Sequence, residues 1–192
     1  MSKASLDYTA SQLAEEVKRL VAIHGQDGPK LLEGLKKPYA AMLAQDLSEA
    51  GVKRQGNHIN NSKYLYYDGE MSITFDQLPK DKYIPPHDHG VWESVGVYSG
   101  KLKHVVYDRK DDGSKEGYAE LEIVDDRVLE ANDLAMVAPP REIHSFQALT
   151  DDTFAVTIVG GRYKPDRAYY KPEQNSYVRL TPQKTGIKET AE

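Results

Sequence analysis

The stretch PPHDHGVWESVGVYSG, residues 85–100, contains two of the six histidines of the chain close to a glutamate. His87 and His89 are two positions apart, and Glu93 follows four positions later. Side chains of an extended strand alternate between two faces, so residues separated by even numbers share a face. If the stretch is extended, these three side chains converge on one side and Trp92 points to the other. Two imidazoles and a carboxylate on one face are typical of a metal site.

The composition of the chain is that of a globular domain. Its 192 residues are 39% hydrophobic and 29% charged, so a sizeable core is available. A net charge of −5 without a basic stripe argues against nucleic acids and anionic membranes as partners. The chain has no cysteine, which excludes disulfides, thiolate ligands and a cysteine nucleophile. No apolar run approaches a membrane span and no signal-peptide pattern opens the chain, so we expect a cytoplasmic protein.

The first third of the chain has the periodicity of helices. Thr9 and Gln12 fit a capping box, and apolar residues then recur at helical spacing up to Gly25. A second helical pattern runs from Leu32 to Leu47, and we expect Pro38 to divide it. These amphipathic helices are expected to pack on the outside of the remaining structure.

From about residue 62, short runs rich in β-branched and aromatic residues alternate with turn residues. Such a series without intervening helices indicates an all-β sandwich or barrel. Trp92 is expected to pack outside this barrel, under a helix. The organisation that we predict is a helical segment at 1–61, a barrel at 62–161, and an irregular wrap and tail at 162–192. The expected strands are Tyr64–Tyr67, Met71–Leu78, Trp92–Tyr98, Leu102–Asp108, Tyr118–Val124, Arg127–Glu130, Leu134–Ala138, His144–Leu149 and Thr153–Val159.

The spacing His87-x-His89-x3-Glu93-x6-Gly100 resembles the first motif of the cupin family at every position. Pro139 and His144 match the proline and histidine of the second cupin motif, whereas Asn132, Arg141 and Ala148 replace two glycines and an asparagine. The resemblance covers about half of the chain. It implies a double-stranded β-helix barrel, here with an N-terminal helical cap. It also implies that His87, His89, Glu93 and His144 hold one divalent metal. That ligand set suits Fe(II), Mn, Ni, Co, Cu or Zn, and selectivity depends on geometry and supply.

Within the cupins, the helical first third, the runs "PPHDHGVW" and "VGVYSG", and "IHSF" around His144 resemble cysteine dioxygenase and 3-mercaptopropionate dioxygenase. In that branch three histidines, which match His87, His89 and His144, hold Fe(II). Glu93 stands where the branch has a cysteine or a small residue. The positions of its Ser-His-Tyr triad are occupied by Ala155, Thr157 and Val159, and the arginine that binds the substrate carboxylate falls near Lys63.

The resemblance favours an Fe(II) dioxygenase that oxidises a small, anionic organic substrate with O2. Glu93 is expected to be a metal ligand or a base, and Lys63 and Arg141 are candidate substrate-binding residues. His104 could face the barrel interior and is assigned a structural role. The alternatives are a non-oxidative metal cupin (an isomerase, lyase or hydrolase), a thiol dioxygenase with an atypical site, and a binding module without turnover. The resemblance is also compatible with a homodimer, which cupins commonly form, but the sequence does not settle the oligomeric state.

Overall fold

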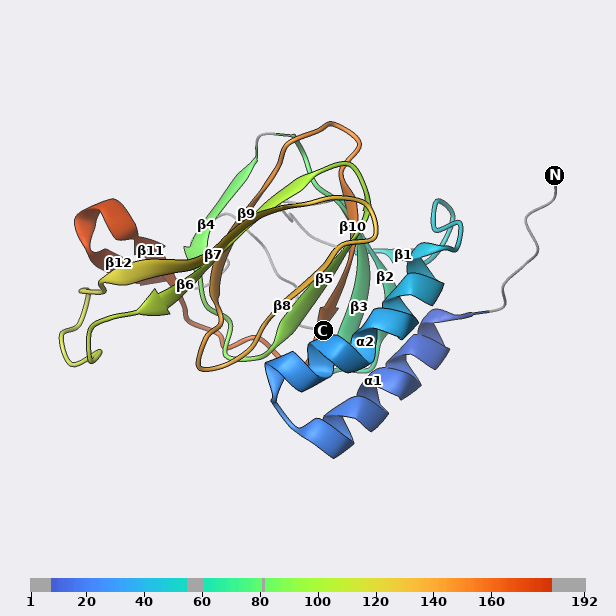
Figure 1. The fold of residues 1–192 in the computed structure, drawn as a ribbon, viewed down its shortest axis with the longest axis horizontal. Coiled ribbons are helices and arrows are strands. Elements are labelled where there is room, and N and C mark those ends of the chain that lie inside the picture. Colours follow the sequence, from blue (N-terminus) through green and yellow to red (C-terminus); the bar gives the residue numbers. More distant parts are fainter. Residues whose placement is uncertain (1–7, 55–60, 81, 181–192) are drawn as a thin grey trace.

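The computed structural model describes residues 8–54, 61–80 and 82–180. Two six-stranded antiparallel sheets face each other, and two helices cover the outer side of one of them (Figure 1). The strand order is β1-β2-β3-β10-β5-β8 in the first sheet and β12-β11-β4-β9-β6-β7 in the second. From β3 to β10 the chain crosses repeatedly between the sheets, as in a double-stranded β-helix. The predicted fold class, a β barrel with N-terminal helices, is therefore confirmed.

The bounds of the elements follow the expected alternation of strands and turns. The two helices come first and a single 3-10 turn lies near the end of the described chain. The elements are α1 (Ala10–His24), α2 (Gly28–Leu43), β1 (Val52–Lys53), β2 (Asn61–Tyr67), β3 (Ser72–Gln77), β4 (Tyr83–His87), β5 (Glu93–Ser99), β6 (Leu102–Arg109), β7 (Leu121–Leu129), β8 (Leu134–Val137), β9 (Ile143–Ala148), β10 (Phe154–Val159), β11 (Arg167–Lys171), η1 (Pro172–Gln174) and β12 (Ser176–Leu180).

The helices begin as their sequences predict. Thr9 accepts a hydrogen bond from the backbone of Gln12, whose side chain reaches back to complete the capping box. The prediction that Pro38 divides the second helix is wrong: α2 runs through Pro38, which is buried, and ends at Leu43. Packing of the buried face of α2 outweighs the local preference of proline against a helix interior. Within the described ranges, neither helix has the length and apolar character needed to cross a membrane.

The helices pack on the outer face of the first sheet. Trp92 is fully buried there among residues of both helices. This agrees with the prediction that Trp92, next to Glu93, faces outward and packs under a helix. Tyr39 of α2 lies against Gly96 of β5, where an added Cβ would come within 2.5 Å of the tyrosine ring. Its hydroxyl contacts Ser94 Oγ at 2.8 Å. This close approach fixes α2 on the strand that begins with Glu93.

Residues 85–100 do not form one extended run, which is the condition under which alternation would place His87, His89 and Glu93 on one face. β4 ends at His87, β5 begins at Glu93, and the two strands belong to opposite sheets. The connection turns at Gly90, whose φ of 80° is costly for residues with a side chain. The two predicted strands at 118–124 and 127–130 are replaced by one strand, β7. Alternation therefore does not bring the histidines and Glu93 together; two facing sheets do.

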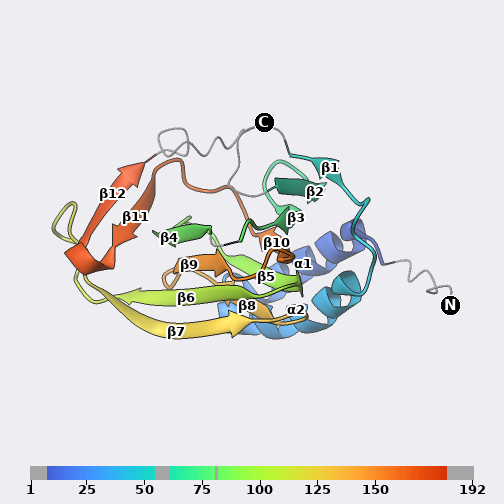
Figure 2. The same ribbon diagram turned by 90° about the horizontal axis from the view of Figure 1, so that it is seen from above.

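The described part of the segment predicted to be an irregular wrap, residues 163–180, contains regular strands. β11 and β12 form an antiparallel hairpin, and β11 pairs with β4 through Tyr169 and His87. Figure 2 shows this hairpin extending the second sheet on the side away from the helices. The hairpin thus adds to the sheet that carries His87.

Candidate metal centre

His87 and His144 are cross-strand neighbours in the second sheet. β4 pairs with β9 so that His87 lies opposite His144. Nδ1 of His87 lies 2.9 Å from the carbonyl oxygen of Pro85. A proton on Nδ1 satisfies that contact and leaves the lone pair of Nε2 available to a metal. The register of two strands therefore places two of the predicted ligands side by side.

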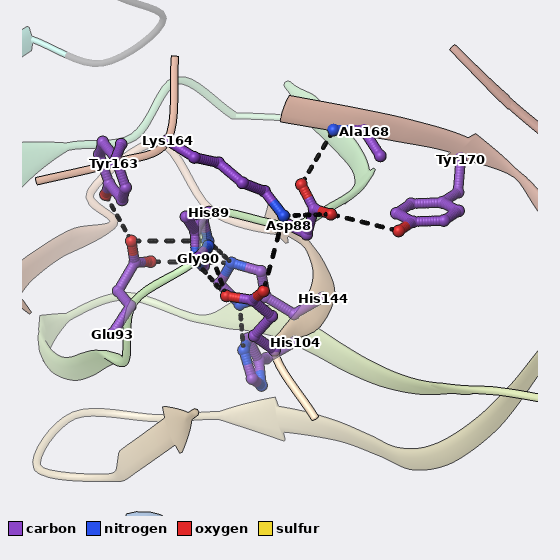
Figure 3. Close-up of polar contacts among 11 residues, drawn as sticks. Asp88, His89, Gly90, Glu93, His104, His144, Tyr163, Lys164, Ala168 and Tyr170 are labelled. Carbon is purple, nitrogen blue, oxygen red and sulfur yellow. Dashed lines mark hydrogen bonds and ion pairs between the residues drawn. The ribbon is translucent and has the colours of Figure 1, made fainter. Parts of the chain in front are cut away.

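His89 reaches the same place from the turn between the sheets. The Lys164 amide donates to the His89 carbonyl at 2.9 Å, and the Gly90 amide donates to Glu142 Oε2 at 2.6 Å. Both bonds hold the turn in position. His89 is fully buried, and its Nε2 lies 2.9 Å from Nε2 of His144 (Figure 3).

Together the three histidines lie close enough to hold one metal ion. Each offers one ring nitrogen, and these atoms lie within 4.8 Å of one another. Burial lowers the pKa of His89 and of His144 well below the ordinary histidine value. Neutral imidazoles are the form that binds metals, so the protonation state fits the donor set.

His104 contacts one of the three histidines, which is more specific than the general structural role predicted for it. Its Nε2 lies 2.9 Å from Nδ1 of His144, and burial lowers its pKa to about 4 (Figure 3). When Nε2 of His144 serves a metal, Nδ1 carries the proton and a neutral His104 accepts it. The alternation of side chains along the strand indicated that His104 could face inward, but alternation alone could not identify its partner.

Glu93 lies beside the three nitrogens. Its Oε2 is 3.8 Å from Nε2 of His89, and its Oε1 is 3.8 Å from Nε2 of His144. The Tyr163 hydroxyl donates to Oε2 at 2.6 Å (Figure 3). The carboxylate therefore faces the centre with one oxygen held by a phenol. Coordination by Glu93 stays a prediction.

A cluster of three charged side chains lies next to His89: Asp88, Glu142 and Lys164. Lys164 Nζ is 2.7 Å from Asp88 Oδ2 and 3.8 Å from Glu142 Oε1. The amide of Ala168 also donates to Asp88 Oδ1, at 2.9 Å (Figure 3). Burial raises the pKa of Glu142, whose Oε2 lies 4.0 Å from Nδ1 of His89. These contacts tie the segment before β11 to the turn that carries His89.

The centre opens on a cavity of about 120 Å³ between the sheets. His87, His144 and Glu93 line it, together with side chains that sequence reasoning missed. Tyr163 and Arg167 belong to the segment predicted to be irregular, where no periodicity indicates orientation. The Arg167 guanidinium stacks on Tyr163, 4.1 Å from the ring centroid. The other lining residues are Arg54, Ser62, Ser72, Thr74, Asp76, Leu78, Ile84, Val95, Leu102, Phe146, Thr157, Val159 and Tyr169.

The structure does not bring the two predicted substrate-binding residues into this cavity. Ser62 pairs with Asp76 and faces inward, so the neighbouring Lys63 faces outward and donates to the Ser48 carbonyl at 2.6 Å. The side chain of Arg141 is 76% exposed and lies 3.3 Å from Asp108. Neither side chain lines the cavity, and a part for either in substrate binding stays a prediction.

Comparisons with known proteins concern the fold alone. No protein-family model and no curated protein matches the chain. Similar solved structures include an uncharacterised conserved protein with a double-stranded β-helix domain from Klebsiella pneumoniae, at 15% identity and a TM-score of 0.43 over 66% of this chain and 96% of that one. An RmlC-like cupin from Shewanella frigidimarina is 18% identical, with a TM-score of 0.43 over 61% and 90%. KdgF from Halomonas sp. is 14% identical, with a TM-score of 0.42 over 58% and 88%.

Proposed function

We propose that the chain is a metal-dependent enzyme that uses Fe(II) at His87, His89 and His144 to oxidise a small organic acid with O2. The observation that carries this proposal is the cluster of three buried imidazoles, whose ring nitrogens lie within 4.8 Å of one another beside the cavity that His87 and His144 line. Bound there, Fe(II) would supply the one-electron chemistry that O2 requires. Fe(II) is favoured by the thiol dioxygenase resemblance, while Mn, Ni, Co, Cu and Zn suit the same donors.

The anionic substrate is supported by Arg167. It is 5% exposed, lines the cavity, and stacks on Tyr163, whose hydroxyl holds Glu93. A guanidinium is a planar fork that binds a carboxylate through two parallel hydrogen bonds. Arg167 would therefore orient an acid beside the metal centre, taking the part expected of Lys63.

Glu93 and Tyr163 would control protons in this site. Tyr163 donates a hydrogen bond to Oε2 of Glu93, and Oε1, which faces His144, would bind the metal or accept a proton from the substrate. The apolar walls, among them Ile84, Val95 and Phe146, would exclude water from the reacting groups.

Oxygen consumption tests this proposal. Protein loaded anaerobically with Fe(II) is mixed with a panel of small carboxylic acids in an oxygen electrode. We expect one acid or more to be consumed with O2 at a rate on the order of 1 per second, typical of enzymes. His87→Ala, which loses a ligand, serves as the inactive control. A panel without oxygen uptake by protein shown to hold iron would contradict the proposal.

A non-oxidative metal enzyme is the second candidate, and the position of Glu93 favours it. A carboxylate beside the centre, already hydrogen-bonded to a phenol, has the arrangement of a general base. The metal would then polarise a carbonyl as a Lewis acid. Turnover of the same acids without O2 would support this alternative.

Thiol substrates are a separate expectation. The positions of the thiol dioxygenase triad hold Ala155, Thr157 and Val159, none of which can replace a histidine or a tyrosine. We expect slow or no oxidation of cysteine and 3-mercaptopropionate. Sulfinate production at about 1 per second would overturn this expectation.

A further inference from the structure

Each of the three clustered histidines has two ring nitrogens, and only one of them can face a metal. For His87 the other nitrogen, Nδ1, lies 2.9 Å from the Pro85 carbonyl oxygen. For His144 it lies 2.9 Å from Nε2 of His104. Nδ1 of His89 differs from both, because it is buried and forms no hydrogen bond with any described residue. A buried polar atom without a hydrogen-bond partner calls for an explanation.

The buried carboxylate of Glu142 lies beside that nitrogen. Its Oε2 is 4.0 Å from Nδ1 of His89, which is too long for a hydrogen bond but close enough for a charge to act strongly in a buried site. The Gly90 amide donates to the same oxygen at 2.6 Å, and Lys164 Nζ lies 3.8 Å from Oε1. These two contacts oppose the effect of burial, favour the ionised carboxylate and hold it in place.

The facing nitrogens of His89 and His144 share one proton. Their Nε2 atoms are 2.9 Å apart, and a hydrogen bond at that distance needs one donor and one acceptor. A second link joins Nδ1 of His144 to Nε2 of His104, so the three rings form a chain (Figure 3). Each neutral imidazole has one proton. The protons of the three rings can therefore be arranged in two ways, which run in opposite directions along the chain.

The charge of Glu142 distinguishes these two arrangements. In the first, His89 donates its proton from Nε2, and the lone pair of Nδ1 faces the carboxylate. In the second, His89 accepts at Nε2, and its own proton lies on Nδ1, beside Glu142. An N–H group is attracted to a buried anion, whereas a lone pair is repelled by it. The second arrangement is therefore favoured, and it leaves Nε2 of His89 without a proton of its own.

We propose that Glu142 is the positioning residue of His89: its charge holds the proton on Nδ1 and keeps Nε2 available to a divalent transition metal. The proposal rests on the proposed function for the metal alone. With a metal at the three histidines, the proton of His144 must lie on Nδ1 instead of Nε2, where His104 accepts it. His89 needs no such change. A shift of about 1 Å would turn its 4.0 Å contact with Glu142 into a hydrogen bond.

Nitrogen-15 NMR of the histidine rings shows directly which nitrogen carries the proton. The six histidines are labelled, and spectra are recorded at neutral pH, first without metal and then with Zn(II), which is diamagnetic. One variant per histidine assigns the signals. We expect His89 to be the Nδ1–H tautomer in both states. His144 and His104 should change from Nε2–H to Nδ1–H when Zn(II) binds, because the metal takes the place of the proton between His144 and His89.

Two variants of Glu142 test its role. Glu142→Leu removes both the charge and the acceptor. We expect His89 to lose its preference for Nδ1–H in the metal-free protein, and the Zn(II) affinity to fall about 10- to 100-fold, as for other groups that support metal ligands. Glu142→Gln keeps the size of the side chain and an oxygen for the Gly90 amide, so we expect it to fold and to show a smaller loss of both. Glu120→Leu, at an exposed position outside the cavity, is the control and should change neither.

The outcomes separate this inference from the proposed function. Protein that takes up no metal contradicts the function, whereas the tautomer of His89 is still measured on the metal-free protein. An Nε2–H tautomer of His89 in the metal-free wild type would overturn the role of Glu142. An unchanged tautomer in both Glu142 variants would do so as well, because the backbone of Val91, which also interacts with the ring of His89, would then hold the proton.

Discussion

At the scale of single residues, the centre depends on which ring nitrogen of each histidine carries the proton. His87 is oriented by the Pro85 carbonyl and His144 by His104, so both can direct Nε2 toward the same point. Burial keeps His89, His104 and His144 neutral by lowering the pKa of each. The groups that hold the outer ring nitrogens therefore decide which nitrogen each histidine offers to a metal.

Replacing His104 by leucine tests this orientation. The change removes the acceptor for Nδ1–H of His144 without touching any ligand atom. We expect metal affinity to fall by about 10- to 100-fold, as for other groups that support metal ligands. Competition with a chromogenic chelator measures the affinity. His24→Leu, at the end of α1, is the control, and equal affinities in the two variants would contradict the role of His104.

Glu93→Gln tests the carboxylate beside the centre. The amide keeps the size of the side chain but removes the charge that would face a dication. We expect the fold to persist, metal affinity to fall, and activity to fall further than metal occupancy does. Metal content, circular dichroism and turnover are measured on one preparation. Unchanged metal content and activity would show that Glu93 is a bystander.

At the scale of elements, the turns between strands determine how the residues of the site are brought together. The turn after β4 moves the chain from one sheet to the other between His87 and Glu93. The turn after β5 ends at Gly100, the glycine of the first motif, with a φ of 75°. A Cβ there would lie 2.6 Å from Cα of Thr153, so this turn needs glycine for space as well as for conformation.

Two glycine variants separate these causes. Gly100→Ala combines the cost of a positive φ with a clash, whereas Gly117→Ala has the same φ of 75° and no atom within 4 Å of its Cβ. We expect Gly117→Ala to cost about 1 kcal/mol of unfolding free energy and Gly100→Ala about 1–3 kcal/mol more. Urea denaturation measures both. Equal losses would show that the tight contact at Gly100 relaxes freely.

The elements also show what could be predicted from sequence. Capping at Thr9, the strand pattern after residue 62 and the opposite parity of Trp92 are local signals, and the structure confirms them. The path of α2 through Pro38 and the join of two predicted strands into β7 depend on packing, which local preference does not contain. Tyr163 and Arg167 lie where the sequence has no periodicity that indicates the direction of a side chain, so the part of the cavity that they line could not be anticipated.

At the scale of the whole molecule, the cavity is shared by segments far apart in the chain. Each sheet supplies one wall, the two helices cover the outer face of one sheet, and the β11–β12 hairpin extends the other (Figure 2). Lys164 joins the segment before β11 to Asp88, next to a predicted ligand. The histidine cluster and Glu93 therefore come together only when both sheets are in place.

The buried histidines make the stability of the metal-free protein depend on pH. His104 has a pKa of about 4 in the folded protein and an ordinary value of 6.5 when unfolded. Between these values the unfolded chain binds more protons, so the stability falls as the pH is lowered from about 7 to 4. His104 alone contributes on the order of 3 kcal/mol to this loss. Urea denaturation at several pH values measures it, and a flat profile over this window would refute the neutral, buried state.

Metal content after loading is the measurement that tests the central claim most directly. Wild-type protein is loaded with Fe(II) anaerobically, freed of excess metal and subjected to elemental analysis beside His87→Ala, His144→Ala and the control His24→Ala. We predict close to one metal per chain in the wild type and the control, and little in the other two variants, because each loses one ring nitrogen of the three-histidine cluster. Wild-type metal content in both cluster variants would contradict the assigned site.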